Sequence, residues 1–73
     1  MNRLLVQVFR NGAWCKVTTI AYEPGHNAID AERKFTKAYR EAMRQVSRWR
    51  SYFSDPLRIV EPTAKGDYRE VRT

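Results

Sequence analysis

The stretch Asn27–Asp55, NAIDAERKFTKAYREAMRQVSRWRSYFSD, decides the fold because its apolar residues recur at steps of three and four. At about 100° per residue, this spacing places them in one stripe along a helix. The stripe contains Ala28, Ala31, Phe35, Ala38, Tyr39, Ala42, Val46, Trp49 and Phe53. Asn27 is a good N-cap, and Pro56 disfavours helical backbone at Asp55. The sequence therefore predicts one long amphipathic helix over Asn27–Asp55 with its apolar side buried.

The opposite side of this helix carries a basic ridge, defined as Arg33, Lys37, Arg40, Arg44 and Arg48. These residues fall within a wedge roughly 80° wide behind the apolar stripe. Neighbouring members are like-charged pairs three or four residues apart, and such pairs destabilise a helix by roughly 0.2–0.5 kcal/mol each. Only Glu41 relieves this repulsion, whereas a solvated helix face usually mixes both signs. The clustering favours a binding role over a merely solvated face.

The charge of the whole chain is concentrated on this helix. The net charge of +6 comes from 14 basic and 8 acidic residues, and Glu32–Arg50 holds seven of the basic residues against two Glu. Such a patch fits an anionic partner, and the candidates are nucleic acid, a membrane surface and an acidic protein. Four of the five ridge residues are Arg, whose planar fork suits bidentate contacts to phosphates or carboxylates. The ridge is about 22 Å long, comparable with several phosphate steps of a duplex.

The segment before the helix predicts a β-hairpin. Asn2–Arg10 and Ala13–Tyr22 flank Asn11-Gly12, a dipeptide that tolerates the positive φ angles of a type I′ turn. With a two-residue loop, the numbers of opposite residues add up to 23. On the core face we expect the pairs Val8–Cys15, Val6–Val17 and Leu4–Thr19. On the other face we expect Phe9–Trp14, Gln7–Lys16 and Leu5–Thr18.

The segment after the helix predicts a third strand over Leu57–Glu61, ended by Pro62. We expect the polar segment 63–73 to be a mobile tail, a fourth edge strand at Tyr68–Val71 being the less favoured alternative. The order β-β-α-β then predicts an α+β domain over residues 1–62. Its three-stranded antiparallel sheet has the order 2-1-3 and packs on the helix.

The predicted helix is longer than the predicted sheet, about 40 Å against about 27 Å. Its last turns, which carry Trp49, Tyr52 and Phe53, are therefore expected to overhang the sheet. The tail, a partner or a second subunit would cover this overhang. A second subunit would do so by forming a homodimer through the end of the helix.

A second candidate site is the hairpin patch, defined as Phe9, Arg10, Trp14 and Lys16. One interpretation is a cross-strand aromatic pair that stabilises the hairpin by roughly 0.5–1 kcal/mol. The other is a stacking platform for unpaired bases, or a protein-binding patch. The sequence leaves both open.

Several site classes find no support. Cys15 is the only cysteine and His26 the only histidine, which excludes an intrachain disulfide and a closed zinc site. We expect Cys15 to be a packed, buried thiol and His26 to be a loop residue. Because paired carboxylates, a glycine-rich phosphate loop and metal spacing are absent, we predict no catalytic residues, metal or cofactor. Without a signal peptide or an apolar run of about 20 residues, we expect a cytoplasmic protein with no membrane role.

Three hypotheses for function remain. We favour a small non-enzymatic protein whose basic ridge engages nucleic-acid phosphates. No recognition-helix turn, zinc-finger spacing or ribonucleoprotein signature predicts sequence-specific readout. The alternative is an inhibitor or adaptor that binds a larger host protein or ribonucleoprotein complex. In size and composition the chain is similar to phage-encoded inhibitors, including anti-CRISPR proteins, although no family motif supports this analogy. The third is a small toxin-like ribonuclease that uses Arg, Lys and Tyr in place of His.

Overall fold

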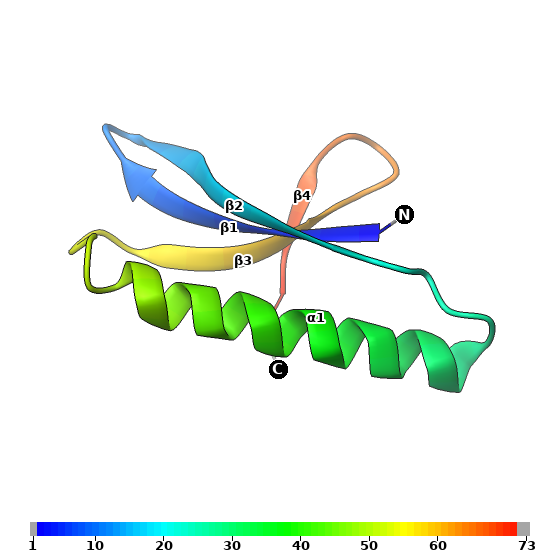
Figure 1. The fold of residues 1–73 in the computed structure, drawn as a ribbon. Coiled ribbons are helices and arrows are strands. Elements are labelled where there is room, and N and C mark those ends of the chain that lie inside the picture. The colour runs from blue at the N-terminus through cyan, green and yellow to red at the C-terminus, as the bar shows by residue number, and fades with distance from the viewer. Residues whose placement is uncertain (1, 72–73) are drawn as a thin grey trace.

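In the computed structural model, which describes residues 2–71, an antiparallel sheet lies against one helix (Figure 1). The elements are β1 (Asn2–Arg10), β2 (Ala13–Tyr22), α1 (Ala28–Trp49), β3 (Leu57–Pro62) and β4 (Tyr68–Glu70). The sheet has four strands in the order β2-β1-β3-β4, and all neighbouring strands are antiparallel. The predicted α+β class with an antiparallel sheet and one helix is confirmed, but the prediction of only three strands is wrong.

The additional strand, β4, lies within the segment that we expected to be a tail. Tyr68–Glu70 pairs with β3, and the ion pair between Arg69 and Glu61 joins the two strands. Their connection is closed by the backbone hydrogen bond from Thr63 N to Asp67 O, 2.8 Å. The less favoured alternative, a fourth edge strand in this segment, is thus the one that forms, because backbone pairing with a neighbouring strand needs no apolar alternation. The rest of the predicted tail, residues 72–73, lies outside the described residues.

The hairpin of β1 and β2 has the predicted register near its turn, but farther from the turn the register between the two strands is shifted. Asn11 and Gly12 have φ angles of 55° and 80°, as a type I′ turn requires. The pairs Val8–Cys15, Phe9–Trp14 and Gln7–Lys16 are confirmed. Beyond a β-bulge the register is shifted by one residue, so the other three expected pairs are wrong. The observed pairs are Val6–Thr18, Leu5–Thr19 and Leu4–Ile20.

The bulge changes which residues of β2 reach the core. The extra residue is Val17, which has no partner in β1. After it, Ile20 and Tyr22 pack against the core. Cys15 is exposed, so the expectation of a packed, buried thiol is wrong.

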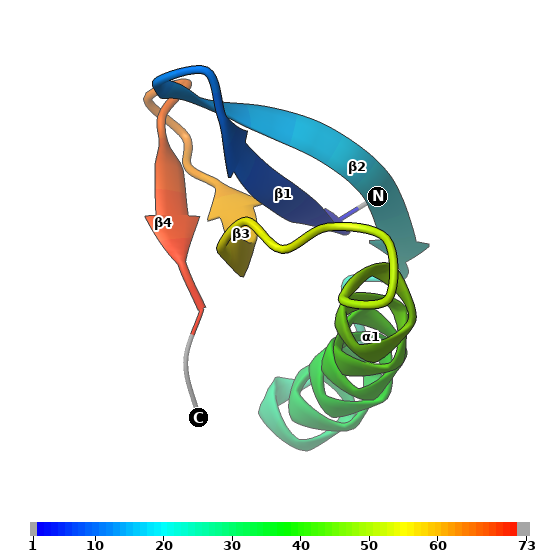
Figure 2. The same ribbon diagram turned by 90° about the vertical axis from the view of Figure 1, so that its left-hand side faces the viewer.

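The core lies between the inner face of α1 and one face of the sheet. Leu4, Val6 and Ile59 contribute the sheet side, and Ala38, Ala42 and Val46 contribute the helix side. Alanine side chains are short, so they allow the helix backbone to approach the strands closely. Viewed along the helix, α1 lies on one side of the sheet while β4 stands away from it (Figure 2). The middle of the predicted apolar stripe therefore faces the core.

The N-terminus of α1 is capped by its own side chains. Asp30 N donates to Asn27 Oδ1 at 2.9 Å, and His26 N donates to Asp30 Oδ2 at 3.0 Å. Asn27 is thus the predicted N-cap. Gly25, with φ of 83°, lies so close that a Cβ there would come within 2.6 Å of the Ala31 backbone. A glycine is therefore required where the chain enters the helix.

The C-terminus of α1 differs from the prediction. The helix ends at Trp49 after 22 residues, so the expected continuation to Asp55 is wrong. Tyr52 N and Phe53 N both donate to Trp49 O at 2.9 Å, which turns the chain back toward β3. A proline limits how far a helix can extend, but the helix can end before it reaches that limit.

The aromatic residues at this end form a cluster instead of an overhang. The ring of Trp49 lies 5.3 Å from that of Tyr52 and 5.8 Å from that of Phe53. The Arg10 guanidinium lies over the Phe53 ring, 5.5 Å from its centroid. The expected overhang of helical turns is not formed, because the helix ends at Trp49, but Tyr52 is 70% exposed. The homodimer through this end remains a prediction.

Candidate nucleic-acid interface

The five residues of the basic ridge are all exposed along α1. Among residues 2–71, there is no hydrogen-bond or ion-pair partner for the side chains of Arg33, Lys37, Arg40 and Arg48. Arg44 is paired: its Nη1 donates to Glu41 Oε2 at 2.8 Å, with 77% of the arginine side chain exposed. An exposed pair at this spacing contributes little to stability and leaves the arginine accessible. The ridge thus presents five exposed cations, four of which lack a carboxylate partner among the described residues.

The N-terminal flank of the helix is balanced by ion pairs and lies beside the ridge. Lys34 Nζ lies 3.0 Å from Glu23 Oε2 and 3.6 Å from Asp30 Oδ2. Its hydrogen bond to Glu23 raises the pKa of Lys34, and the same bond lowers the pKa of Glu23. Lys34 is therefore matched by carboxylates within the chain, in contrast to Lys37 one turn further along.

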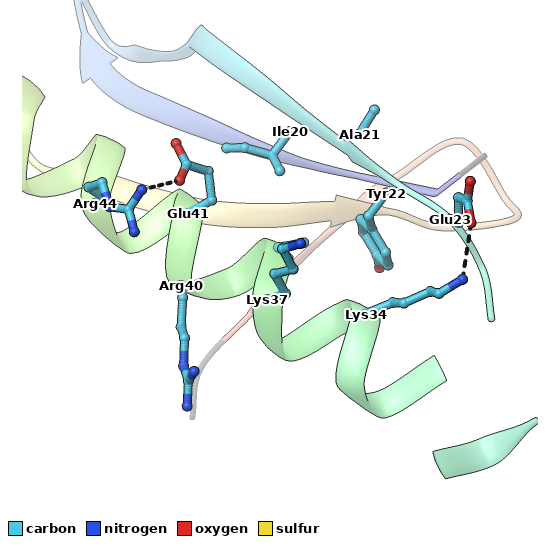
Figure 3. Close-up of a pocket in the computed structure, with 10 residues that line it drawn as sticks. Ile20, Ala21, Tyr22, Glu23, Lys34, Lys37, Arg40, Glu41 and Arg44 are labelled. Atoms are coloured by element: carbon cyan, nitrogen blue, oxygen red, sulfur yellow. Dashed lines mark hydrogen bonds and ion pairs between the residues drawn. The ribbon is translucent and has the colours of Figure 1, made fainter. Parts of the chain in front are cut away.

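A groove of about 600 Å³ separates this flank from the end of β2 (Figure 3). Its strand side is formed by Ile20, Ala21, Tyr22 and Glu23, and its helix side by Lys34, Lys37, Ala38, Arg40, Glu41 and Arg44. Lys37 points toward the sheet, whereas Arg40 points away from it (Figure 3). The ridge thus has one side toward solvent and one side on a groove. The sequence did not indicate this groove, because it arises where two distant segments meet.

Tyr22 gives the groove an aromatic wall. Its ring meets that of Phe35 edge-on, with the centroids 6.2 Å apart. Burial, and secondarily the charge of Glu61, raises the pKa of Tyr22, while a hydrogen bond with Asn2 acts in the opposite direction. The phenol is therefore neutral at physiological pH and adds no negative charge to the groove.

The aromatic pair of the hairpin patch forms as predicted, but another residue covers part of it. The rings of Phe9 and Trp14 lie 5.2 Å apart at an interplanar angle of 55°. The Arg58 guanidinium lies over the Trp14 ring, 4.0 Å from its centroid, and Arg58 Nε donates to Gln7 Oε1 at 2.9 Å. One face of the indole is thus occupied from within the chain. This geometry favours the structural interpretation of the aromatic pair over a stacking platform.

The two cations of the hairpin patch have different surroundings. Arg10 Nε lies 3.6 Å from Asp55 Oδ2, in addition to its contact with Phe53. Lys16 is exposed and has no ion pair with the described residues. Arg58 could not be assigned to this patch from the sequence, because β3 brings it there from far along the chain.

Other site classes gain no candidate from the described part of the chain. Residues 2–71 contain no group of three or more His, Cys, Asp or Glu side chains placed to hold a metal ion. No helix in the same range is both long and apolar enough to cross a membrane. Comparisons with protein-family models, with curated proteins and with solved structures find no match to this chain.

Proposed function

We propose that this chain is a small non-enzymatic binding protein whose basic ridge contacts the phosphates of nucleic acid. One observation carries the proposal. Four of the five ridge cations are exposed without a carboxylate partner among the described residues, on a helix whose other face is buried. Such cations repel one another in the free protein, and a row of phosphates would relieve that repulsion.

The shape of the ridge fits backbone contacts better than base readout. From Arg33 to Arg48 the helix rises about 22 Å, so that successive side chains can follow a line of phosphates. Guanidinium groups bind phosphate oxygens in a bidentate manner without reading sequence. We therefore expect binding that depends on salt and differs little between sequences.

The test is fluorescence anisotropy with labelled duplex and single-stranded DNA and RNA of mixed sequence. We expect binding in about 50 mM salt that weakens strongly toward physiological salt. Arg40→Glu/Arg44→Glu should weaken binding roughly 200-fold at the lower salt, because two phosphate contacts are lost. The matched control is Arg3→Glu/Lys65→Glu, which changes the net charge equally at two exposed residues outside the helix. It should retain most of the affinity.

Each contrary result has a definite meaning. Equal losses in the two variants would show that net charge, and not the ridge, drives binding. No binding in about 50 mM salt would contradict the proposal and favour the inhibitor or adaptor alternative. Cleavage of the RNA by the purified protein would instead favour the toxin-like ribonuclease.

A further inference from the structure

The outer edge of β2 has no neighbouring strand. The strand order places this ten-residue strand at one edge of the sheet, while the three-residue β4 forms the other edge. An exposed edge strand offers its backbone N–H and C=O groups to a further strand. The bulge at Val17 interrupts this edge, and Thr18–Tyr22 beyond it is regularly paired with β1.

The pattern of backbone hydrogen bonds that β1 makes with its two neighbouring strands defines which backbone N–H and C=O groups of β2 point outward. Phe9 N donates to Pro56 O at 3.0 Å, so Phe9 directs its backbone groups toward β3. Because this direction alternates along an antiparallel strand, Leu5 and Arg3 do the same. Their partners in β2 are Thr19 and Ala21, whose N–H and C=O groups therefore point to the open edge. Both residues are exposed.

The groove beside this edge determines the chemistry of the strand that fits it. Ile20 and Tyr22 direct their side chains to the helix side, where Lys37 and Arg44 line the opposite wall. Lys37 has no carboxylate partner among the described residues, and Arg44 already binds the carboxylate of Glu41. The groove also holds the carboxylates of Glu23 and Glu41, which Lys34 and Arg44 match. A strand added here would thus place alternate side chains over a wall whose unmatched charge is the cation of Lys37.

We propose that the Thr18–Tyr22 edge accepts an extended acidic segment of another protein as a fifth strand. Its backbone pairs with Thr19 and Ala21, and carboxylates on alternate residues face Lys37 and Arg44. Alternate residues of a strand are about 6.8 Å apart, and Lys37 and Arg44 are separated by about 10 Å of helix rise, within reach of their flexible side chains. A second copy of this chain fits less well, because each copy brings a net charge of +6 to the same edge.

The proposal goes beyond nucleic-acid binding and does not depend on it. It gives the adaptor alternative a specific surface. Because Lys37 and Arg44 belong to both surfaces, the acidic segment and nucleic acid are expected to compete.

The test uses fluorescence polarisation of a labelled peptide of alternating Val and Glu. Two further peptides carry N-methyl groups on the backbone, one at every odd residue and the other at every even residue. In each peptide the methyl groups block hydrogen bonds along one edge of the strand and leave the other edge free to pair. One of the two should bind at least about tenfold more weakly than the other, because its methyl groups replace the hydrogen bonds to β2. Equal affinity of the two would overturn the proposal, because attraction between charges alone does not distinguish them.

A protein variant gives a second readout. Ala21→Pro removes one outward N–H and no ladder hydrogen bond, as prolines on edge strands do. It should weaken peptide binding about tenfold and leave the anisotropy with nucleic acid unchanged. Ala21→Val, which retains the N–H, is the matched control and should bind the peptide like the parent protein.

The two proposals fail in different ways. Undiminished peptide binding by folded Ala21→Pro overturns the fifth strand, whatever nucleic acid does. If Ala21→Pro does not fold, the pair of N-methylated peptides decides. A dimer that sedimentation detects in the parent protein and not in Ala21→Pro would overturn the acidic segment in favour of a second copy.

Discussion

The two faces of α1 differ in how completely the fold explains them. On the inner face, Ala38, Ala42 and Val46 are 4%, 0% and 4% exposed and pack against the sheet. On the outer face, the basic ridge is exposed, and most of its members contact no carboxylate of the described chain. Packing accounts for these three inner residues, whereas the outer cations repel one another, and in the described part of the chain only Arg44 among them pairs with a carboxylate. This difference is the basis of the proposal that the ridge binds a partner outside the chain.

The largest effect on stability should come from introducing a carboxylate on the inner face instead of the outer face. Ala42→Glu places a carboxylate at a fully buried position within the apolar core, which costs several kcal/mol and should unfold a domain of this size. Arg40→Glu introduces the same side chain two residues away on the exposed face and should leave the protein folded. Circular dichroism during urea titration measures both.

This comparison fails if the two variants lose similar stability. Loss of folding in Arg40→Glu would mean that the ridge takes part in holding the domain together. A stable Ala42→Glu would mean that the inner face is not packed as described.

A smaller effect, of opposite sign, is expected when one ridge charge is removed. Arg40→Gln relieves the like-charged pairs with Lys37 and Arg44, which should stabilise the protein by roughly 0.4–1 kcal/mol in dilute salt. The gain should shrink as salt screens the repulsion. Thermal unfolding at two salt concentrations measures it, with Arg3→Gln as the control outside the helix. A loss of stability would contradict the account of the outer face.

The smallest effect concerns the capped N-terminus, where charge is matched within the chain. The hydrogen bond from His26 N lowers the pKa of Asp30 below its ordinary value of 3.8, and Lys34 contributes in the same direction. A lowered folded-state pKa contributes stability above the unfolded pKa, which is lost as pH falls through the folded value. Stability should therefore decline from about pH 4 downward.

Asp30→Asn keeps an acceptor for His26 N but removes this titration. Its stability should depend less steeply on pH over the same acid range, as urea titrations at several pH values would show. Glu32→Gln is the matched control, since it removes another negative charge near the helix N-terminus without these contacts. An unchanged slope in Asp30→Asn would contradict the role assigned to the cap.

What the sequence predicted was local. Asn11-Gly12 indicated the turn, Asn27 indicated the start of the helix, and the three- and four-residue spacing indicated which side of it is buried. Each of these signals acts through hydrogen bonds or side-chain directions within a few residues. They required no knowledge of the rest of the chain.

What the sequence did not predict depends on distant partners. The bulge at Val17 shifts the register between two strands, and β4 owes its formation to β3. The helix ends at Trp49, and Phe53 then contacts the Trp49 ring, although Pro56 lies seven residues further on. The groove and the covering of Trp14 by Arg58 likewise join segments that only the tertiary structure brings together.

The most direct test of the central claim is the salt dependence of duplex DNA binding. A plot of log affinity against log salt should be linear, with a slope of about −4.5 if all five ridge cations contact phosphates. In Arg40→Gln/Arg44→Gln the slope should become less steep by about 2. The same slope in both proteins, or no binding in dilute salt, would show that the ridge does not contact nucleic-acid phosphates.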